Sequence, residues 1–207
     1  MALAVLLIVI AADIGTSVYK SRTEIPDYQV AWVGNYSLPQ DTVTALETQL
    51  AALGEDCNGD GRVIVRINSY VLNSEGDNAE YAAAGNVRLL GDLDDCDSYF
   101  FLFDPDVPLQ QNYGILARED GTLAEEGADD WFSISWGASP VLAGLSLGTY
   151  SDTILGETMS GDSQELLSGM SLARRGFVTG RTSANLAQCD ALWKKIIYGG
   201  NGNEEKE

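Results

Sequence analysis

Short oxygen-bearing side chains recur at every second position from Asp56 to Asp60, and Gly61 follows them. This spacing matches the first six positions of a calcium-binding loop, where such side chains converge on the ion and a glycine permits the turn. A bidentate glutamate normally completes the loop at position 12, but that position is Ile67 here. Two interpretations stay open: a weak Ca²⁺ site of Asp56, Asn58 and Asp60, or a helix-to-strand turn favoured by Asp, Asn and Gly.

A second acidic pair, Asp104 and Asp106, follows the aromatic run at 98–103, which predicts a buried strand. Ligands of open α/β sheets bind beyond the carboxyl ends of the strands, so these carboxylates stand where a ligand-binding site is expected. Because Pro105 separates them, the alternative is an acidic turn stabilised by proline. Asp104 and Asp106 are therefore the candidate ligand-binding residues.

The chain contains no histidine. Ser-His-Asp and Cys-His catalysis, histidine-containing zinc sites and histidine pH switches are therefore excluded. Ser171 stands in a Gly-x-Ser-x-Ala context, but no histidine is present to activate it as a nucleophile. Cys57, Cys96 and Cys189 form no C-x-x-C pair, and their number allows either one disulfide with a free thiol or three free thiols.

The chain is strongly acidic, with a formal net charge of −19. Between residues 23 and 173 there are 26 Asp and Glu residues but only four arginines and no lysine. Such a surface repels a polyanion, which argues against nucleic acid as a partner. A solvated acidic exterior keeps a protein soluble and monomeric, so we expect a monomer; an exterior that attracts cations is the alternative.

The N-terminal end is apolar without a break over residues 2–12. Because a spanning helix needs about 20 residues, the run predicts a signal-peptide core or the outer end of a membrane anchor over 1–19, rather than a complete span. Export segments begin with basic residues, whereas Lys20 and Arg22 follow the run, so we expect the native start to lie upstream of Met1. A buried core helix is the alternative.

The rest of the 207-residue chain predicts one domain, because it is too short for two of ordinary size. We expect a linker over 20–27, a single extracellular α/β domain over 28–198 and a disordered polar tail over 199–207.

Strand and helix signals alternate in the first half of the domain. They predict strands at 28–34, 63–72 and 98–103, a helix that begins at Pro39, and a helix over 79–93. The partly polar strand at 63–72 is expected either to have one less buried face or to lie at an edge of the sheet.

The second half predicts shorter elements: strands at 113–117, 131–136 and 147–154, a helical turn after Ser139, and a final helix over 184–198 with Ser183 as its N-cap. In so acidic a chain we expect Arg174, Arg175 and Arg181 to be internal salt-bridge partners, and an anion site is the alternative.

This order of elements resembles the first lobe of extracellular solute-binding proteins. The resemblance covers residues 28–105 and rests on strand 28–34, a helix, the turn Asp56-Asn58-Asp60-Gly61, strand 63–67, a helix with Gly91-Asp92, and strand 99–103 ending in Asp104-Pro105. The chain as a whole is similar to uncharacterised membrane-anchored surface proteins of clostridia-type bacteria. It is too short for a second lobe with hinge strands, so no ligand residue carries over from the solute-binding family.

Together these features predict an α/β fold, a three-layer sandwich with a mixed, partly parallel sheet, preceded by a hydrophobic export or anchor segment. The expected function is that of a non-catalytic, membrane-tethered domain on the bacterial cell surface. It would bind a small ligand or an envelope protein, and Ca²⁺ could stabilise it. A hydrolase that uses Asp104 and Asp106, and a structural spacer of an envelope complex, are the alternatives.

Overall fold

The computed structural model describes residues 24–72, 79–125, 127–154 and 157–199. Five strands form the main sheet, in the spatial order β2 (Val65–Val71), β1 (Tyr28–Gly34), β3 (Phe100–Phe103), β7 (Ser171–Arg174) and β4 (Ser133–Ser135). The first three are parallel, whereas β7 runs antiparallel to both of its neighbours. The fold is therefore α/β with a mixed, partly parallel sheet, as predicted, and β2 occupies the predicted edge position.

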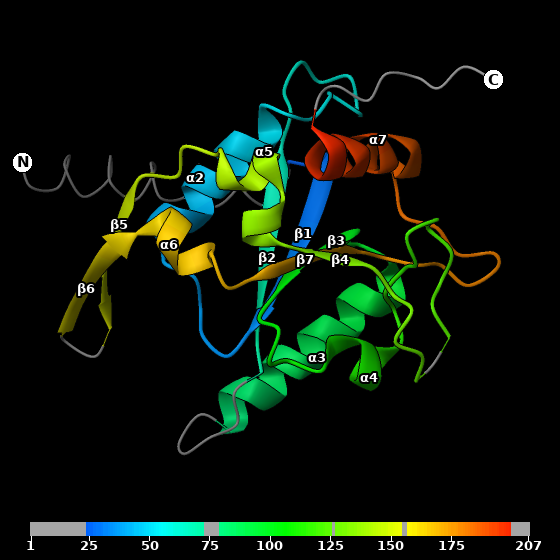
Figure 1. Ribbon diagram of the computed structural model, residues 1–207, viewed down its shortest axis with the longest axis horizontal. Helices are drawn as coiled ribbons and strands as arrows, with labels where there is room; N and C mark the ends of the chain where they lie inside the picture. The colour runs from blue at the N-terminus through cyan, green and yellow to red at the C-terminus, as the bar shows by residue number, and fades with distance from the viewer. Residues whose placement is uncertain (1–23, 73–78, 126, 155–156, 200–207) are drawn as a thin grey trace, which may run out of the picture.

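Helices cover both faces of the sheet (Figure 1). One face carries α2 (Gln40–Ala51), α5 (Pro140–Ala143), α6 (Ser163–Leu167) and α7 (Leu186–Tyr198). The other face carries α3 (Ala79–Asp95) and α4 (Leu109–Tyr113). A 3₁₀ turn, η2 (Trp136–Ala138), follows β4.

The alternation of side chains along β1 explains why both faces need a cover. Trp32 packs into the hydrophobic cluster that includes Leu46 of α2 and Trp193 of α7. Its neighbour Val33 packs into the opposite cluster with Leu89 of α3. Because successive side chains of a strand point to opposite faces, the mostly apolar β1 requires helices on both sides.

The order of the parallel strands separates the loops that follow them at the carboxyl ends of the strands. The chain passes from β1 through α2 to β2, then returns through α3 to β3 on the other side of β1. The loop after β1 leads to α2 on one face, whereas the loop after β3 leads to α4 on the other face, so these two loops diverge. This is the topological switch point at which open α/β sheets bind ligands.

A separate two-stranded hairpin, β5 (Thr149–Ile154) and β6 (Glu157–Asp162), projects from the α2 side of the molecule (Figure 1). Its base is held by α6: Asp162 caps that helix through the backbone N–H groups of Gln164 and Glu165. Ser163 contacts Thr42 of α2 across a buried hydroxyl pair 2.9 Å apart. The hairpin therefore has a fixed root on α2.

Several predicted elements of the second half differ from the structure. Residues 113–117 are not a strand: Tyr113 ends α4, and Leu116 makes only an isolated bridge to Arg175. The strand predicted at 131–136 is reduced to β4, because Trp136 already belongs to η2. The last helix begins at Leu186, with Asn185 rather than Ser183 at the N-cap.

The predicted export or anchor segment over 1–19, the first half of the linker and nearly all of the predicted tail lie outside the described residues. Across the parts of the chain that the structure describes, no helix combines the length and the hydrophobicity that a bilayer crossing requires.

Candidate functional site

The two acidic groups singled out in the sequence lie at opposite ends of the strands of the main sheet. The Asp56 loop (residues 56–62) precedes β2 and lies at the amino ends of β1 and β2. Asp104 and Asp106 follow β3 and lie at the carboxyl edge. The two groups therefore cannot form one site.

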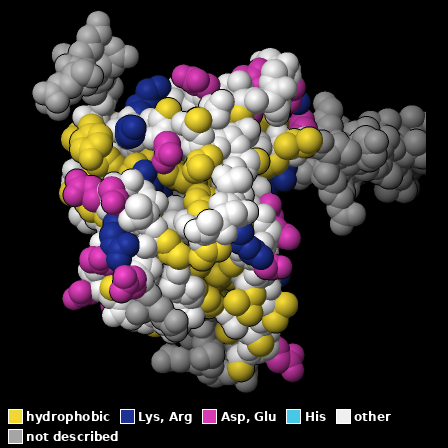
Figure 2. Space-filling view, turned by 90° about the vertical axis from the view of Figure 1, so that its right-hand side faces the viewer, with side chains coloured by type: hydrophobic (Ala, Val, Ile, Leu, Met, Phe, Trp, Pro, Cys, Tyr) yellow, Lys and Arg dark blue, Asp and Glu magenta, His cyan; other side chains and the backbone are white. Residues whose placement is uncertain are grey.

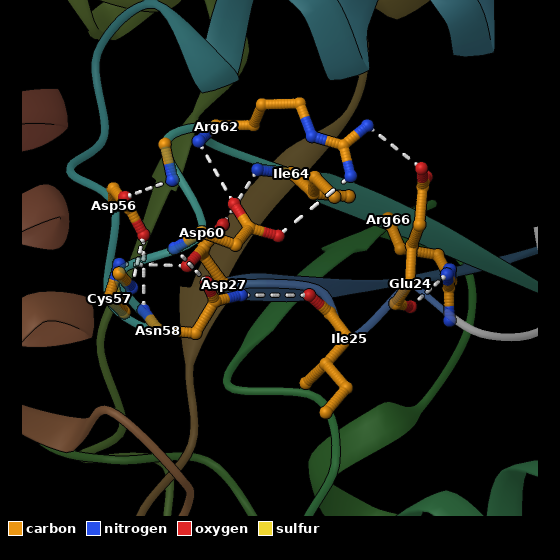
Figure 3. Close-up of polar contacts among 12 residues, drawn as sticks. Glu24, Ile25, Asp27, Asp56, Cys57, Asn58, Asp60, Arg62, Ile64 and Arg66 are labelled. Atoms are coloured by element: carbon orange, nitrogen blue, oxygen red, sulfur yellow. Dashed lines mark hydrogen bonds and ion pairs between the residues drawn. The ribbon is translucent and has the colours of Figure 1, made fainter. Parts of the chain in front are cut away.

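Side-chain oxygens of the Asp56 loop accept hydrogen bonds from its own backbone (Figure 3). Asp56 accepts from the N–H groups of Gly59 at 2.7 Å and Gly61 at 2.8 Å. Asn58 accepts from Asp60 N–H at 2.9 Å, and both glycines have positive φ angles that side chains rarely adopt. These contacts build the turn that was one of the two interpretations.

Asp27 supports this loop from the chain just before β1. Its side chain is only 3 % exposed, and its two oxygens accept from the N–H groups of Cys57 and Ile64, each at 2.8 Å (Figure 3). The carboxylate thus holds the start of the loop close to the residues that follow it. The sequence offers only a weak signal for this role, a single aspartate directly before an apolar strand.

The described residues contain no group of three His, Cys, Asp or Glu side chains placed to hold a metal ion. The pKa of Asp56 is lowered, first by the N–H of Gly61 and then by those of Gly59 and its neighbours, so the carboxylate is stabilised by the turn itself. Calcium binding by Asp56, Asn58 and Asp60 stays a prediction.

At the carboxyl ends of the strands, the side chains of Asp104 and Asp106 have different neighbours. Asp104 accepts a hydrogen bond from the Asn35 side chain, at 3.3 Å, and lies beside the loop that follows β1. Asp106 instead lines a hollow of about 340 Å³ between the end of β3 and Trp131, which we call the Asp106 hollow. The structure does not bring the two carboxylates to a common hollow.

The largest hollow at this edge lies on the β1 and β2 side and measures about 710 Å³; we call it the Tyr36 hollow. It is lined by residues of the loop after β1, the end of β2, α3, α6 and the hairpin: Asn35, Tyr36, Ser37, Pro39, Val71, Tyr81, Tyr150, Asp152, Met159 and Leu166. Sequence reasoning located this edge through Asp104 but identified none of these lining residues. They come from five separate segments whose meeting depends on the tertiary fold.

Trp32 fixes the loop that carries Tyr36. The Trp32 indole is fully buried, and its Nε1 donates to the backbone carbonyl of Tyr36 at 2.8 Å. Gly34 allows the chain to fold over this ring, because a Cβ there would meet the indole at 2.5 Å. The Tyr36 ring lies 5.7 Å from the indole and is 38 % exposed, so it is held in place while still facing solvent.

The opposite wall of the Tyr36 hollow comes from the hairpin. The Ser151 N–H donates to Asp41 at the start of α2, at 3.2 Å, which fixes β5 beside that helix. Tyr150 lines the hollow from this strand, and Met159 lines it from β6 with 54 % of its surface exposed. Burial, and then the negative charge of Asp104 and the proximity of Tyr150, raise the pKa of Tyr36.

A third hollow, of about 230 Å³, lies near Cys96, Arg175 and Phe177.

Figure 2 shows the side of the molecule that is at the right in Figure 1, where hydrophobic side chains gather across the middle and charged ones surround them. The acidic composition therefore does not produce a uniformly charged surface.

The arginines of the second half have structural partners. Arg174 pairs with Asp190 of α7, and Arg181 pairs with Asp94 of α3, each at 3.0 Å. Arg175 donates to backbone carbonyls in the last turns of α3, where a cation compensates the negative helix end. The predicted salt bridges are confirmed for Arg174 and Arg181, whereas Arg175 binds carbonyls instead. All three cysteines are free thiols.

Comparison with known proteins finds no matching family, no similar curated protein and no similar solved structure.

Proposed function

We propose that this chain is a non-catalytic binding domain that takes a small ligand into the Tyr36 hollow. The proposal includes a bacterial cell-surface location, with the N-terminal apolar segment as membrane tether. One observation carries it: five segments converge on a hollow of about 710 Å³ beside the carboxyl ends of the parallel strands β1 and β2. That volume lies within the range of roughly 300–1,000 Å³ for small-molecule sites.

The composition of the hollow supports ligand binding. Its lining combines aromatic and apolar side chains with a few polar groups, among them Asn35, Ser37 and Asp152. Ligand sites commonly pair a large apolar area, which supplies affinity, with a few polar groups, which fix orientation. A purely structural spacer would need an apolar contact surface and would have no use for such a hollow.

The arrangement of the carboxylates favours binding over hydrolysis. Carboxylate-dependent hydrolysis needs two carboxyl groups that face one substrate. Asp104 is engaged with Asn35, whereas Asp106 lines a different hollow. The leading candidates for such chemistry are therefore not arranged as an acid–base pair.

The tether rests on the apolar run at 2–12 and on the polar stretch that separates it from β1. Protease treatment of intact cells that express the protein tests this part. Loss of the domain from intact cells is expected, and full protection of the domain would contradict a surface location.

The binding function is tested by a ligand-observed NMR screen of small organic fragments against the full chain. Tyr150→Ala removes one wall of the hollow, and Tyr198→Ala, at an exposed position of α7, is the matched control. We expect fragments that bind the native chain and Tyr198→Ala but not Tyr150→Ala. Binding that is equal in all three proteins, or absent from all of them, would refute the proposal.

A further inference from the structure

We infer that the Tyr36 hollow selects an organic cation, a small molecule that joins an ammonium group to an apolar or aromatic body. This inference rests on the proposed function and adds the chemical class of the ligand.

Aromatic rings provide the first reason. Tyr36, Tyr81 and Tyr150 reach the hollow from the loop after β1, from α3 and from β5. The negative face of an aromatic ring attracts a cation, and several rings around one cavity are a known arrangement for quaternary and primary ammonium groups. Met159 adds a polarizable apolar surface for the body of the ligand.

The charges around the hollow provide the second reason. Asp152 lines it directly, and Asp104 accepts a hydrogen bond from Asn35, which also lines it. Asp41 lies at the neighbouring end of the hairpin, where it accepts from Ser151. Among the described residues that line the hollow there is neither lysine nor arginine. A ligand carboxylate or phosphate would therefore meet negative charge without a compensating cation, whereas an ammonium group gains from the same field.

The third hollow provides an internal contrast. Arg175 and Arg181 line it together with Cys96, so the charged side chains that line this hollow are cationic, whereas Asp152 lines the Tyr36 hollow. Those arginines lie at the opposite, carboxyl end of α3, to which both donate. The two hollows thus differ in the sign of the nearest charged side chains, and a matched set of probes can distinguish them.

The test uses three probes of similar shape that differ in charge: 2-phenylethylammonium, 2-phenylethanol and 3-phenylpropanoate. Dissociation constants are measured by titration calorimetry on the full chain at physiological ionic strength. We expect the ammonium probe to bind at least about tenfold more tightly than the carboxylate probe, with the alcohol between them.

Asp152→Asn removes the charge at the wall and keeps the shape of the side chain. It is expected to weaken the ammonium probe by about fivefold or more and to leave the alcohol unchanged. Asp129→Asn, at an exposed position outside the lining, is the matched control and should change neither. Unchanged binding of the alcohol shows that the hollow of Asp152→Asn is intact.

Each outcome separates the inference from the proposed function. If the alcohol or the carboxylate binds as tightly as the ammonium probe, and Tyr150→Ala abolishes that binding, the hollow is a site but the inference is wrong. If the ammonium probe is preferred and Asp152→Asn has no effect, the assigned charge is wrong and the inference is overturned. If no probe binds, the inference fails, and the fragment screen decides whether the proposed function fails with it.

Discussion

At the scale of single residues, Asp27 shows how one buried carboxylate organises a long loop. Both of its oxygens accept backbone N–H groups, one from Cys57 near the start of the Asp56 loop and one from Ile64 just after its end. An alanine would leave two amide donors in a nearly closed environment, and each such loss costs about 1–3 kcal/mol. The Asp56 loop was recognisable from its own residues, but Asp27 was not, because its role depends on the pairing of β1 with β2.

The first prediction concerns this residue. Asp27→Ala is expected to lower the free energy of unfolding by about 3 kcal/mol, because two charge-assisted hydrogen bonds are lost. In a domain of this size that corresponds to a melting temperature roughly 6–12 °C lower. Asp60→Ala, which removes an exposed turn contact, is the control and should cost less than about 1 kcal/mol. Equal losses in thermal unfolding of the two variants would contradict the proposed role of Asp27.

The second prediction concerns pH. The pKa of Asp56 lies below its ordinary value of 3.8, first because the Gly61 N–H donates to it. A lowered folded-state pKa means that the charged form stabilises the fold at pH values above 3.8, and that this contribution is lost as the pH falls through the folded-state pKa. Asp56→Asn should therefore be less stable than the native chain near neutral pH, with the difference closing in acid. Urea unfolding measured across this range would contradict the account if the difference stayed constant.

At the scale of elements, α3 shows why two glycines of one helix have different roles. Both interrupt an otherwise helical pattern, and sequence alone gives them the same helix-weakening effect. In the structure, a Cβ at Gly85 would approach the backbone carbonyl oxygen of Val71 to 2.4 Å, whereas a Cβ at Gly91 would meet nothing within 4 Å. Gly85 therefore permits close packing of α3 against β2, and Gly91 does not contribute to packing.

This contrast gives the third prediction. Gly85→Ala should destabilise the fold by about 1–2 kcal/mol, because overpacking against a rigid backbone costs more than the helix gains from alanine. Gly91→Ala should instead stabilise it, by up to about 1 kcal/mol. Chemical denaturation of both variants provides the measurement, and effects of the same sign would show that the packing of α3 on β2 is wrong.

The fourth prediction concerns the hairpin. A Cβ at Gly161 would come within 2.9 Å of the Tyr150 hydroxyl, which is the movable tip of a side chain. Gly161→Ala should therefore leave stability almost unchanged but turn the Tyr150 ring, so that fragments bind the Tyr36 hollow several-fold more weakly. Gly169→Ala, where a Cβ meets no atom within 4 Å, is the matched control. If fragments bind Gly161→Ala as tightly as the native chain, Tyr150 does not contribute to the site.

Element prediction from the sequence succeeded where apolar periodicity was strong and failed where elements were short. The pattern at 28–34 predicted β1 with its observed bounds, since the strand is apolar on both faces. The strand β7 was missed, because its four residues Ser171–Arg174 include an arginine and owe their strand form to pairing with β3 and β4. The hairpin partner β6 was missed for a similar reason: its polar sequence carries no burial signal.

At the scale of the whole molecule, the location of the candidate site was predictable but its lining was not. A strand ending in Asp104 pointed to the carboxyl edge, because ligands of open α/β sheets bind there. The lining residues lie on the loop after β1, on α3, on α6 and on the hairpin, and no spacing rule connects them. Their convergence follows from the return of the chain across β1 and from the fixed root of the hairpin on α2.

The central claim is that the Tyr36 hollow is the binding site, and chemical-shift mapping tests it most directly. The full chain, labelled with ¹⁵N, is titrated with the tightest-binding fragment of the screen, and the shifted amides are located in the structure. The account predicts the largest shifts at Tyr36, Tyr81 and Tyr150. Shifts that cluster instead around Asp106 or around Arg175 would place the site in the Asp106 hollow or in the hollow near Cys96 and contradict the account.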